Sequence, residues 1–169
     1  MEQEASREAP GDTLHEATAD VADRLGPGAA VCHLPFRSFG AVGRTSGLIA
    51  CVRTYEDAGL VRDMLSAAGD GRILVVDGRG SCRAALIGDR LARMGLSNGW
   101  RGVVINGAIR DADVLSTLPF AVLALGATPR RGSLAGEGDR GVQLAFGGIA
   151  FRPGQRLWLD TDGVLVSAQ

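Results

Sequence analysis

The chain has 169 residues, 46% of them hydrophobic and 22% charged, a composition typical of a soluble globular domain. Its 18 basic and 19 acidic side chains nearly cancel, so net charge gives no general attraction to nucleic acid or acidic membranes. It has no apolar run of about 18 residues to span a membrane, and the acidic N-terminus lacks the apolar core of a signal peptide. We therefore expect a cytoplasmic protein with one domain over residues 13–169, preceded by a disordered tail over residues 1–12.

Two features of the composition restrict the chemistry. There is no lysine, because all 18 basic residues are arginine, so Schiff-base catalysis has no side-chain amine to use. Histidine occurs only at His15 and His33, too few for a histidine-rich zinc site. The cysteines, Cys32, Cys51 and Cys82, form no CxxC pair, which argues against a zinc knuckle or a disulfide framework. Any catalysis must then rest on carboxylates, arginines, backbone amides and a metal ion.

Apolar periodicity and turn residues predict the elements of the first half of the chain. These are a helix that begins at Thr13 or Thr18 and ends near Leu25, a strand over 47–54, a helix over 56–67 and a strand over 72–76. The last of these is a short apolar run bounded by glycines, which is typical of a strand buried on both faces.

The second half is predicted in the same way. Its elements are a helix that begins at Ser81 and carries Ile87, Leu91 and Met94 on one face, strands over 102–105 and 120–124, and antiparallel strands over 142–166. Strand, helix and strand over residues 72–106 would form a right-handed βαβ unit. The predicted class is a mixed α/β domain with a central βαβ unit and a β-rich C-terminal half.

The strongest functional signal is an aspartate, Asp89, separated by 20 residues from the pair Arg110-Asp111. A helix, a turn and a strand of that length would bring the two ends of the stretch together. Free N–H groups at a helix start bind carboxylate or phosphate oxygens, and Gly88 would let a ligand approach the backbone closely. Arginine offers a planar fork to a carboxylate, and aspartate is a hard oxygen ligand for Mg²⁺.

Each part of this signal also has a plainer interpretation. A helix that runs straight through from its predicted start would leave Gly88 as a packing contact and Asp89 solvated. Arg110-Asp111 could be a surface ion pair that caps the following helix. Asp113 competes with Asp111 for the role of metal ligand, but it has no arginine beside it.

Three loops carry weaker signals. Asp77-Gly78-Arg79-Gly80 follows a strand and could line the same crevice, but it lacks the dinucleotide and phosphate-loop fingerprints, which favours a structural role. The loop from Pro129 to Ser133 has two adjacent arginines, which would attract an anion or a neighbouring subunit unless they are merely solvated. Glu137 and Asp139 could reach a site across an interface.

Several landmarks follow one another along the chain: Phe39-Gly40, Glu56-Asp57, LVVDGRGS (74–81), GDRLA (88–92), GVVINGAIRD (102–111), FGGIAFRPG (146–154) and DTDGV (160–164). With these the chain resembles the RraA-like proteins over about residues 14–167. That family includes the regulators of ribonuclease E activity and the class II 4-hydroxy-4-methyl-2-oxoglutarate aldolases. One departure is Ala58, which stands where many members have asparagine after Glu-Asp.

The resemblance assigns roles to the signal described above. Substrate is bound through the backbone amides of Gly88, Asp89, Arg90 and Leu91. Arg110 binds substrate, and Asp111 holds a divalent metal cation, Mg²⁺ or Mn²⁺, through its carboxylate and waters. For the reaction itself we expect Arg110 to stabilise developing negative charge, and Asp89 to hydrogen-bond a metal-bound water that can relay a proton. Members with aldolase activity carry the complete signature, as this chain does.

The resemblance further implies a single-domain swivelling β/β/α fold that assembles as a homotrimer or hexamer. The implied reaction is cleavage of 4-hydroxy-2-oxo acids to pyruvate, with decarboxylation of oxaloacetate as a related activity. Such an aldolase uses either a lysine imine or a metal, and the absence of lysine leaves the metal route. The alternative is a regulator that binds ribonuclease E without catalysis. A menaquinone methyltransferase is not supported, because the sequence has no glycine-rich S-adenosylmethionine loop.

Overall fold

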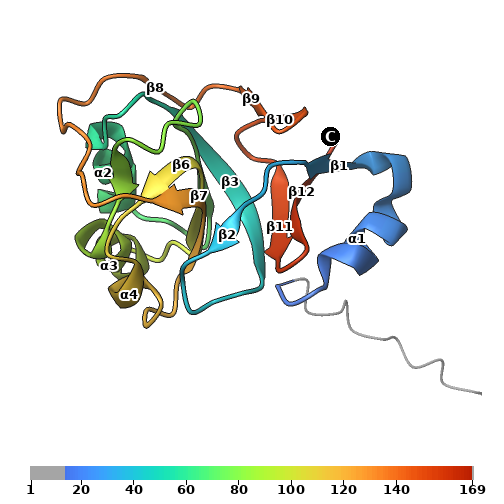
Figure 1. Cartoon of the computed structure of the whole chain (residues 1–169). Coiled ribbons are helices and arrows are strands. Elements are labelled where there is room, and N and C mark those ends of the chain that lie inside the picture. The colour runs from blue at the N-terminus through green and yellow to red at the C-terminus, as the bar shows by residue number, and fades with distance from the viewer. Residues whose placement is uncertain (1–13, 169) are drawn as a thin grey trace, which may run out of the picture.

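A computed structural model describes residues 14–168 (Figure 1). The tail predicted over residues 1–12 lies outside the described residues. The helices are α1 (Thr18–Leu25), α2 (Gly59–Ser66), α3 (Asp89–Ser97) and α4 (Ala112–Leu115), with a 3-10 turn at Gly26–Gly28. The strands are β1 (Ala29–Cys32), β2 (Arg37–Ser38), β3 (Thr45–Arg53), β4 (Ile73–Asp77), β5 (Ala85–Ile87), β6 (Gly102–Ile109), β7 (Ala121–Ala127), β8 (Asp139–Arg140), β9 (Leu144–Phe146), β10 (Ile149–Phe151), β11 (Arg156–Asp160) and β12 (Gly163–Ser167).

Within the described residues, the main sheet runs in the order β1-β12-β11-β3-β4-β6-β7-β2, and β9 and β10 form a separate hairpin. The long strand β3 joins two parts of the sheet. Its first half, Thr45 to Leu48, pairs antiparallel with β11, and its second half, Ile49 to Arg53, pairs parallel with β4. The strands β4, β6 and β7 are all parallel, while β1, β11 and β12 are antiparallel.

These two parts of the sheet stack on one another, and the helices α2, α3 and α4 cover the outer face of the parallel part (Figure 1). Side chains of β4 show the layering, because successive residues of a strand point to opposite faces. Leu74 and Val76 pack toward the helices, whereas Ile73 and Val75 pack toward the antiparallel strands. The result is a β/β/α arrangement in one domain, which confirms the predicted fold class.

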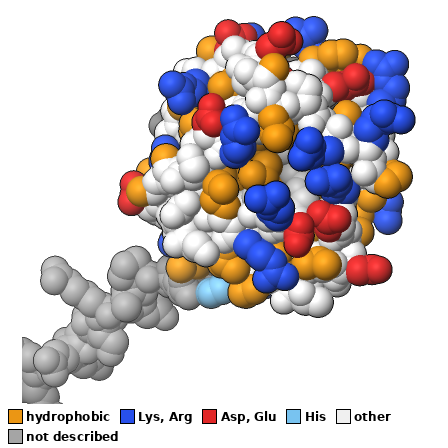
Figure 2. Space-filling view, turned by 90° about the vertical axis from the view of Figure 1, so that its left-hand side faces the viewer, with side chains coloured by type: hydrophobic (Ala, Val, Ile, Leu, Met, Phe, Trp, Pro, Cys, Tyr) orange, Lys and Arg blue, Asp and Glu red, His pale blue; other side chains and the backbone are white. Residues whose placement is uncertain are grey.

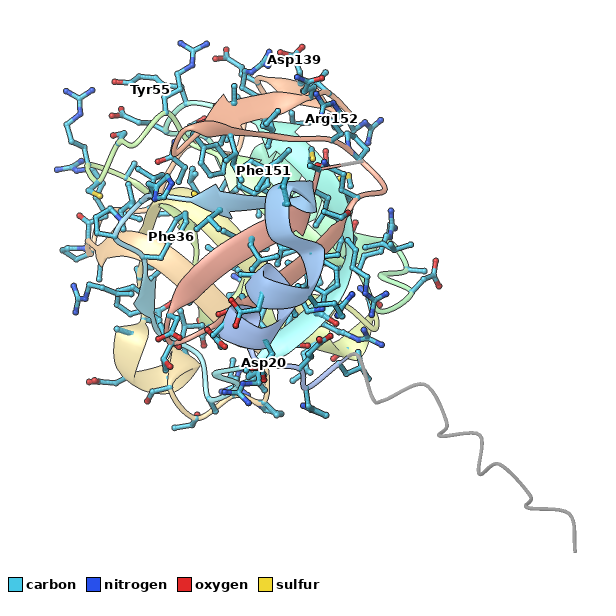
Figure 3. All side chains as sticks on the ribbon, turned by 90° about the vertical axis from the view of Figure 1, so that its right-hand side faces the viewer. Asp20, Phe36, Tyr55, Asp139, Phe151 and Arg152 are labelled. Carbon is cyan, nitrogen blue, oxygen red and sulfur yellow. The ribbon has the colours of Figure 1, made fainter. Side chains whose placement is uncertain are left out.

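The helix α1 closes the opposite side of the molecule by lying over β11 and β12 (Figure 3). Its Val21 is fully buried and packs against Trp158 and Leu165. Two hydrogen bonds from Thr18 to the carboxylate of Asp160, at 2.8 and 2.6 Å, fix the start of this helix. The helix ends at Leu25, as Gly26-Pro27 predicted.

The structure corrects the prediction of a helix from Ser81. Residues 85–87 instead form β5, which pairs with the end of β6, and the helix α3 begins only at Asp89. The spacing of Ile87, Leu91 and Met94 does fit a helix. β5 has only three residues, too few to show the alternating pattern that would have predicted a strand there. Pairing with a distant strand therefore decided the local structure. The interpretation in which a helix runs through Gly88 is wrong.

Other boundaries shift less. α2 begins at Gly59 rather than Glu56, because Glu56 has a left-handed backbone (φ 52°) and the Asp57 carboxylate accepts the Gly59 N–H at 2.7 Å. β6 continues to Ile109, four residues beyond the predicted end of this strand at residue 105. The strand predicted over 120–124 is present as β7 and is parallel to β6. Among the described residues, no helix is long and apolar enough to cross a membrane.

Candidate functional site

The central strand β6 carries the Arg110-Asp111 pair at its carboxyl end. All eight residues of β6 are buried, so the end of the strand is held firmly. The N–H of Arg110 donates to the Ile87 carbonyl at 3.0 Å, which ties it to β5. Asp111 then adopts a left-handed conformation (φ 59°, ψ 40°) and begins α4. Aspartate is one of the few non-glycine residues that tolerates this conformation, and the sharp turn directs both side chains toward α3.

The start of α3 faces this turn. Its N-cap residue is Gly88, which has no side chain to cap the helix. The first hydrogen bond of the helix runs from the N–H of Ala92 to the carbonyl of Gly88 at 3.0 Å. The Asp89 N–H donates to Oδ2 of Asp111 at 3.0 Å. The helix start therefore already binds one carboxylate oxygen, as its dipole and free N–H groups favour. The N–H groups of Arg90 and Leu91 remain for a ligand.

Gly88 makes this close approach possible. A Cβ at position 88 would lie 2.5 Å from Oδ2 of Asp111 and 3.2 Å from Cγ of Arg110. Its backbone is otherwise ordinary for any residue (φ −138°). The glycine is therefore required for space rather than for backbone conformation, and the groups that approach it are the side chains of Asp111 and Arg110; the approach of a ligand stays a prediction.

A cavity of about 240 Å³ lies between these two elements, α2 and the loop that follows β7. It is lined by Ala58, Arg62, Ala85, Leu86, Ile87, Gly88, Asp89, Arg90, Leu91, Met94, Arg110, Asp111, Arg131 and Leu134. Arginine and hydrophobic side chains gather on this face of the molecule, with acidic side chains beside them (Figure 2). Four of the lining residues are arginines and two are aspartates, so the cavity favours anions.

The structure brings all six predicted site residues to this one cavity, while their individual roles remain predictions. The side chains of Arg110, Asp89 and Asp111 are about one-third exposed, so a small molecule can reach them. Arg110 and Asp111 also form the ion pair of the plainer interpretation, with Nε 4.0 Å from Oδ2, and Asp111 is the N-cap residue of α4. Asp113, the competing ligand, does not line the cavity.

One arginine of the cavity, Arg62, was not predicted from the sequence, and another, Arg131, was predicted only in part. Arg131 was noted in its loop as a residue that could attract an anion, but nothing in the sequence placed it beside Arg110. Arg62 had no signal at all, because a single arginine on a helix is usually solvated. Only the packing of α2 against α3 brings it to the site.

The weaker loops lie elsewhere. Residues 77–80 do not line the cavity, and Asp77 is buried and hydrogen-bonded, which fits the structural role favoured from the sequence. Glu137 and Asp139 are exposed and do not line the cavity either. Nearby, Glu56 binds Ser81 and Arg83, and these hydrogen bonds lower the pKa of its carboxyl.

Comparison with known proteins decides the family. The family model described as RraA-like, Aldolase/RraA, matches residues 18–166. The chain belongs to the RraA-like family. A relative from Xanthomonas campestris pv. campestris (strain 8004), named "Putative 4-hydroxy-4-methyl-2-oxoglutarate aldolase", is 48% identical over 151 residues, which are 89% of this chain and 90% of the relative.

Two solved structures resemble this RraA-like chain closely. One, described as an RNA-processing inhibitor RraA from Thermus thermophilis, is 40% identical with a TM-score of 0.88, covering 92% of this chain and 94% of the other. The second is described as an S-adenosylmethionine: 2-dimethylmenaquinone methyltransferase from Geobacillus kaustophilus HTA426. It is 43% identical with a TM-score of 0.89, covering 91% of this chain and 96% of the other.

The family resemblance implies a divalent metal, and the residues of the cavity fit one kind of metal site. Among residues 14–168, no three His, Cys, Asp or Glu side chains gather to form a protein cage. Mg²⁺ and Mn²⁺ suit oxygen ligands, and Mg²⁺ commonly binds one or two carboxylates and keeps several waters. Both contacts of the Asp111 carboxylate within the described residues use Oδ2. Its Oδ1 is thus the donor that a water-rich metal site would use.

Proposed function

We propose that this RraA-like protein is a class II aldolase that cleaves 4-hydroxy-2-oxo acids such as 4-hydroxy-4-methyl-2-oxoglutarate to pyruvate, with oxaloacetate decarboxylation as a second activity. One observation carries the proposal. The carboxylate of Asp111, the guanidinium of Arg110 and the start of α3 meet in one arginine-lined cavity. The name of the Xanthomonas relative supports the same reaction class.

Substrate binding follows from the charges of the cavity. A 2-oxo dicarboxylate carries two negative charges, and the four arginines outnumber the two aspartates that line the walls. The N–H groups of Arg90 and Leu91 would hold the carboxylate next to the oxo group, as helix N-termini do for anions. The apolar side chains of Leu91 and Met94 would exclude water from the carbon chain of the substrate.

A divalent metal would be held by Asp111, and when bound it supplies a Lewis acid for the 2-oxo group, in place of the lysine imine that this chain cannot form. Arg110 would orient the substrate near its C4 hydroxyl or oxo group. Its positive charge would stabilise the negative charge that develops when the C3–C4 bond breaks. The interaction strengthens toward the transition state, so it raises the rate rather than affinity alone.

Asp89 is the group that would move a proton. Its carboxylate is 37% exposed at the cavity, and its nearest ion-pair partner is Arg93, with Nε 4.0 Å from Oδ2. Through a water, Asp89 would accept the proton of the C4 hydroxyl as the C3–C4 bond breaks and the new carbonyl forms, and would then return that proton to C3 of the pyruvate enolate. Oxaloacetate decarboxylation gives the same enolate, which explains why one site would serve both reactions.

The experiment that tests this proposal measures pyruvate release from 4-hydroxy-4-methyl-2-oxoglutarate and from oxaloacetate, with Mg²⁺ and with EDTA. We expect turnover with Mg²⁺ and its loss with EDTA. Arg110→Lys should retain the charge but lose the planar fork, and its kcat should fall by about 10²-fold. Absence of turnover of both compounds by folded, Mg²⁺-loaded protein would refute the proposal.

A second candidate function is regulation of ribonuclease E by protein binding, which the description of the Thermus neighbour as an RNA-processing inhibitor favours. This role needs no chemistry at Asp111. Capture of ribonuclease E that is equally strong with the Asp111→Asn protein, together with no turnover, would favour it. A methyltransferase role, suggested by the description of the Geobacillus neighbour, has less support because the sequence has no glycine-rich S-adenosylmethionine loop.

A further inference from the structure

Asp57 is a buried carboxylate that the proposed chemistry does not use. It is only 2% exposed, and its oxygens accept hydrogen bonds from donors in two segments. Oδ1 accepts the N–H of Gly59 at 2.7 Å and the N–H of Gly136 at 3.1 Å, and Oδ2 accepts the hydroxyl of Ser133 at 2.8 Å. Burial acts to raise the pKa of Asp57, but these hydrogen bonds lower it below its ordinary value. Asp57 is therefore ionised at neutral pH.

The two donors from the far segment belong to the loop of residues 129–138, which connects β7 to β8. Most of this loop is exposed, so it gains little from apolar burial. Its three glycines, Gly132, Gly136 and Gly138, would favour many other conformations. Loops with few buried apolar contacts open at low free-energy cost unless polar contacts hold them.

Asp57 supplies such contacts where the loop reaches α2. The loop is also joined by backbone hydrogen bonds, from Gly132 N–H to Ala85 at 2.9 Å and from Ala58 N–H to Ser133 at 2.7 Å. Beyond Ser133, the Asp57 carboxylate accepts the Gly136 N–H and so holds the loop against the start of α2. The approach is close, because a Cβ on Gly59 would lie 2.4 Å from the nitrogen of Gly136.

This loop supplies one wall of the cavity, through Arg131 and Leu134. We infer that Asp57 is a positioning residue whose carboxylate holds the loop of residues 129–138 closed, so that Arg131 and Leu134 contact the bound substrate. The catalytic consequence rests on the proposed function, whereas the closed loop does not. Hydrogen bonds to a charged acceptor are about twice as strong as neutral ones, which suits this purpose.

The expected kinetic effect is on substrate binding. Arg131 and Leu134 take no part in the proposed bond cleavage or proton transfer, so we expect their contacts with substrate to be equal in the ground state and the transition state. Losing such uniform contacts raises KM and leaves kcat nearly unchanged. In Asp57→Ala we expect KM to rise about 10-fold while kcat stays within about 3-fold.

The matched control is Asp160, a second buried carboxylate in the part of the sheet that α1 covers. It is 6% exposed and accepts hydrogen bonds from Thr18 and Asp162, so Asp160→Ala removes similar contacts far from the cavity. Both alanine variants should lose stability, but only Asp57→Ala should raise KM. Asp57→Asn should recover most of the wild-type KM, because its amide oxygen still accepts the N–H groups of Gly59 and Gly136.

Amide hydrogen exchange tests the loop itself without requiring turnover. We expect residues 130–138 to exchange faster in folded Asp57→Ala than in wild type and in Asp160→Ala. Unchanged protection of residues 130–138 in Asp57→Ala would overturn the inference, whether or not the protein is an aldolase. Faster exchange in a protein without aldolase activity would support the closed loop and refute the proposed function separately.

Discussion

Two neighbouring strands of this protein each have an aspartate and an arginine at their carboxyl end, yet only one of these pairs lines the cavity. β4 ends in Asp77, with Arg79 two residues later, and β6 is followed by Arg110-Asp111. Asp77 is buried, and its Oδ1 accepts both the amide of Asn106 at 3.0 Å and the N–H of Arg79 at 2.9 Å. Asp111 is 37% exposed and accepts one hydrogen bond, from the Asp89 N–H.

The difference comes from strand length. Asp77 pairs with Asn106 in register, but β6 continues to Ile109 and β5 pairs with this extension. Asp77 therefore lies inside the molecule, where its Oδ1 accepts two hydrogen bonds. The next residues of β6 carry Asp111 past the edge of β4 to the wall of the cavity. Residue type and position at a strand end are thus not sufficient to line the cavity; the strand must also extend beyond its neighbour.

Removing the negative charge of Asp111 tests this comparison most strongly. Asp111→Asn retains the shape, tolerates the left-handed backbone and can still accept the Asp89 N–H, so the fold should persist. We expect pyruvate release to fall by about 10²–10³-fold or more, because the metal loses its anchoring carboxylate. Asp113→Asn is the matched control, since it is exposed, adjacent in sequence and outside the cavity. Equal activity of the two variants would contradict the assignment of Asp111.

A methyl group at residue 88 should move the Asp111 carboxylate without changing any charge. The added Cβ of Gly88→Ala would lie 2.5 Å from Oδ2, so the side chain must shift and the Asp89 N–H bond is lost. Misplacing a catalytic group by about 1 Å can cost on the order of 10²-fold in rate, which is the loss expected here. Gly43→Ala, where a Cβ meets nothing within 4 Å, should leave turnover unchanged.

Sequence reasoning predicted the apolar parts of β4, β6 and β7 well, because each is a short apolar run whose pattern needs no distant partner. It failed at β5. The spacing of Ile87, Leu91 and Met94 indicates a helix, and only pairing with β6 shows that Ile87 belongs to a strand. That error matters, because α3 can begin after Gly88 only if the preceding residues form β5 instead of a helix.

The candidate site was predictable where its residues are close in sequence or carry the family signature. The six residues between Gly88 and Asp111 come together as the spacing suggested. Arg62 could not be found, because its role depends on how α2 packs against α3. The hydrogen bonds between Asp57 and the loop of residues 129–138 could not be predicted either, since nothing near Asp57 in sequence indicates its partners Ser133 and Gly136.

Changing Asp77 examines the other side of the comparison. Asp77→Ala leaves the amide of Asn106 and the N–H of Arg79 without their acceptor, and an unsatisfied buried donor costs about 1–3 kcal/mol. We expect the free energy of unfolding in urea to fall by that amount. The kcat per folded molecule should stay within about 2-fold of wild type, because no reacting group moves. A large loss of kcat in stable Asp77→Ala protein would show that the two strand ends act together.

The smallest expected effect concerns Asp160, a buried carboxylate whose two oxygens both accept hydrogen bonds. Burial acts to raise the pKa of Asp160, but hydrogen bonds from Thr18 and Asp162 and the nearby charge of Arg44 lower it below its ordinary value. A group whose pKa is lower in the folded state stabilises the fold above its unfolded pKa, and this stability is lost as the pH falls through about 4 and below. Asp160→Asn should therefore flatten the fall in unfolding free energy between about pH 5 and pH 2, measured by urea denaturation.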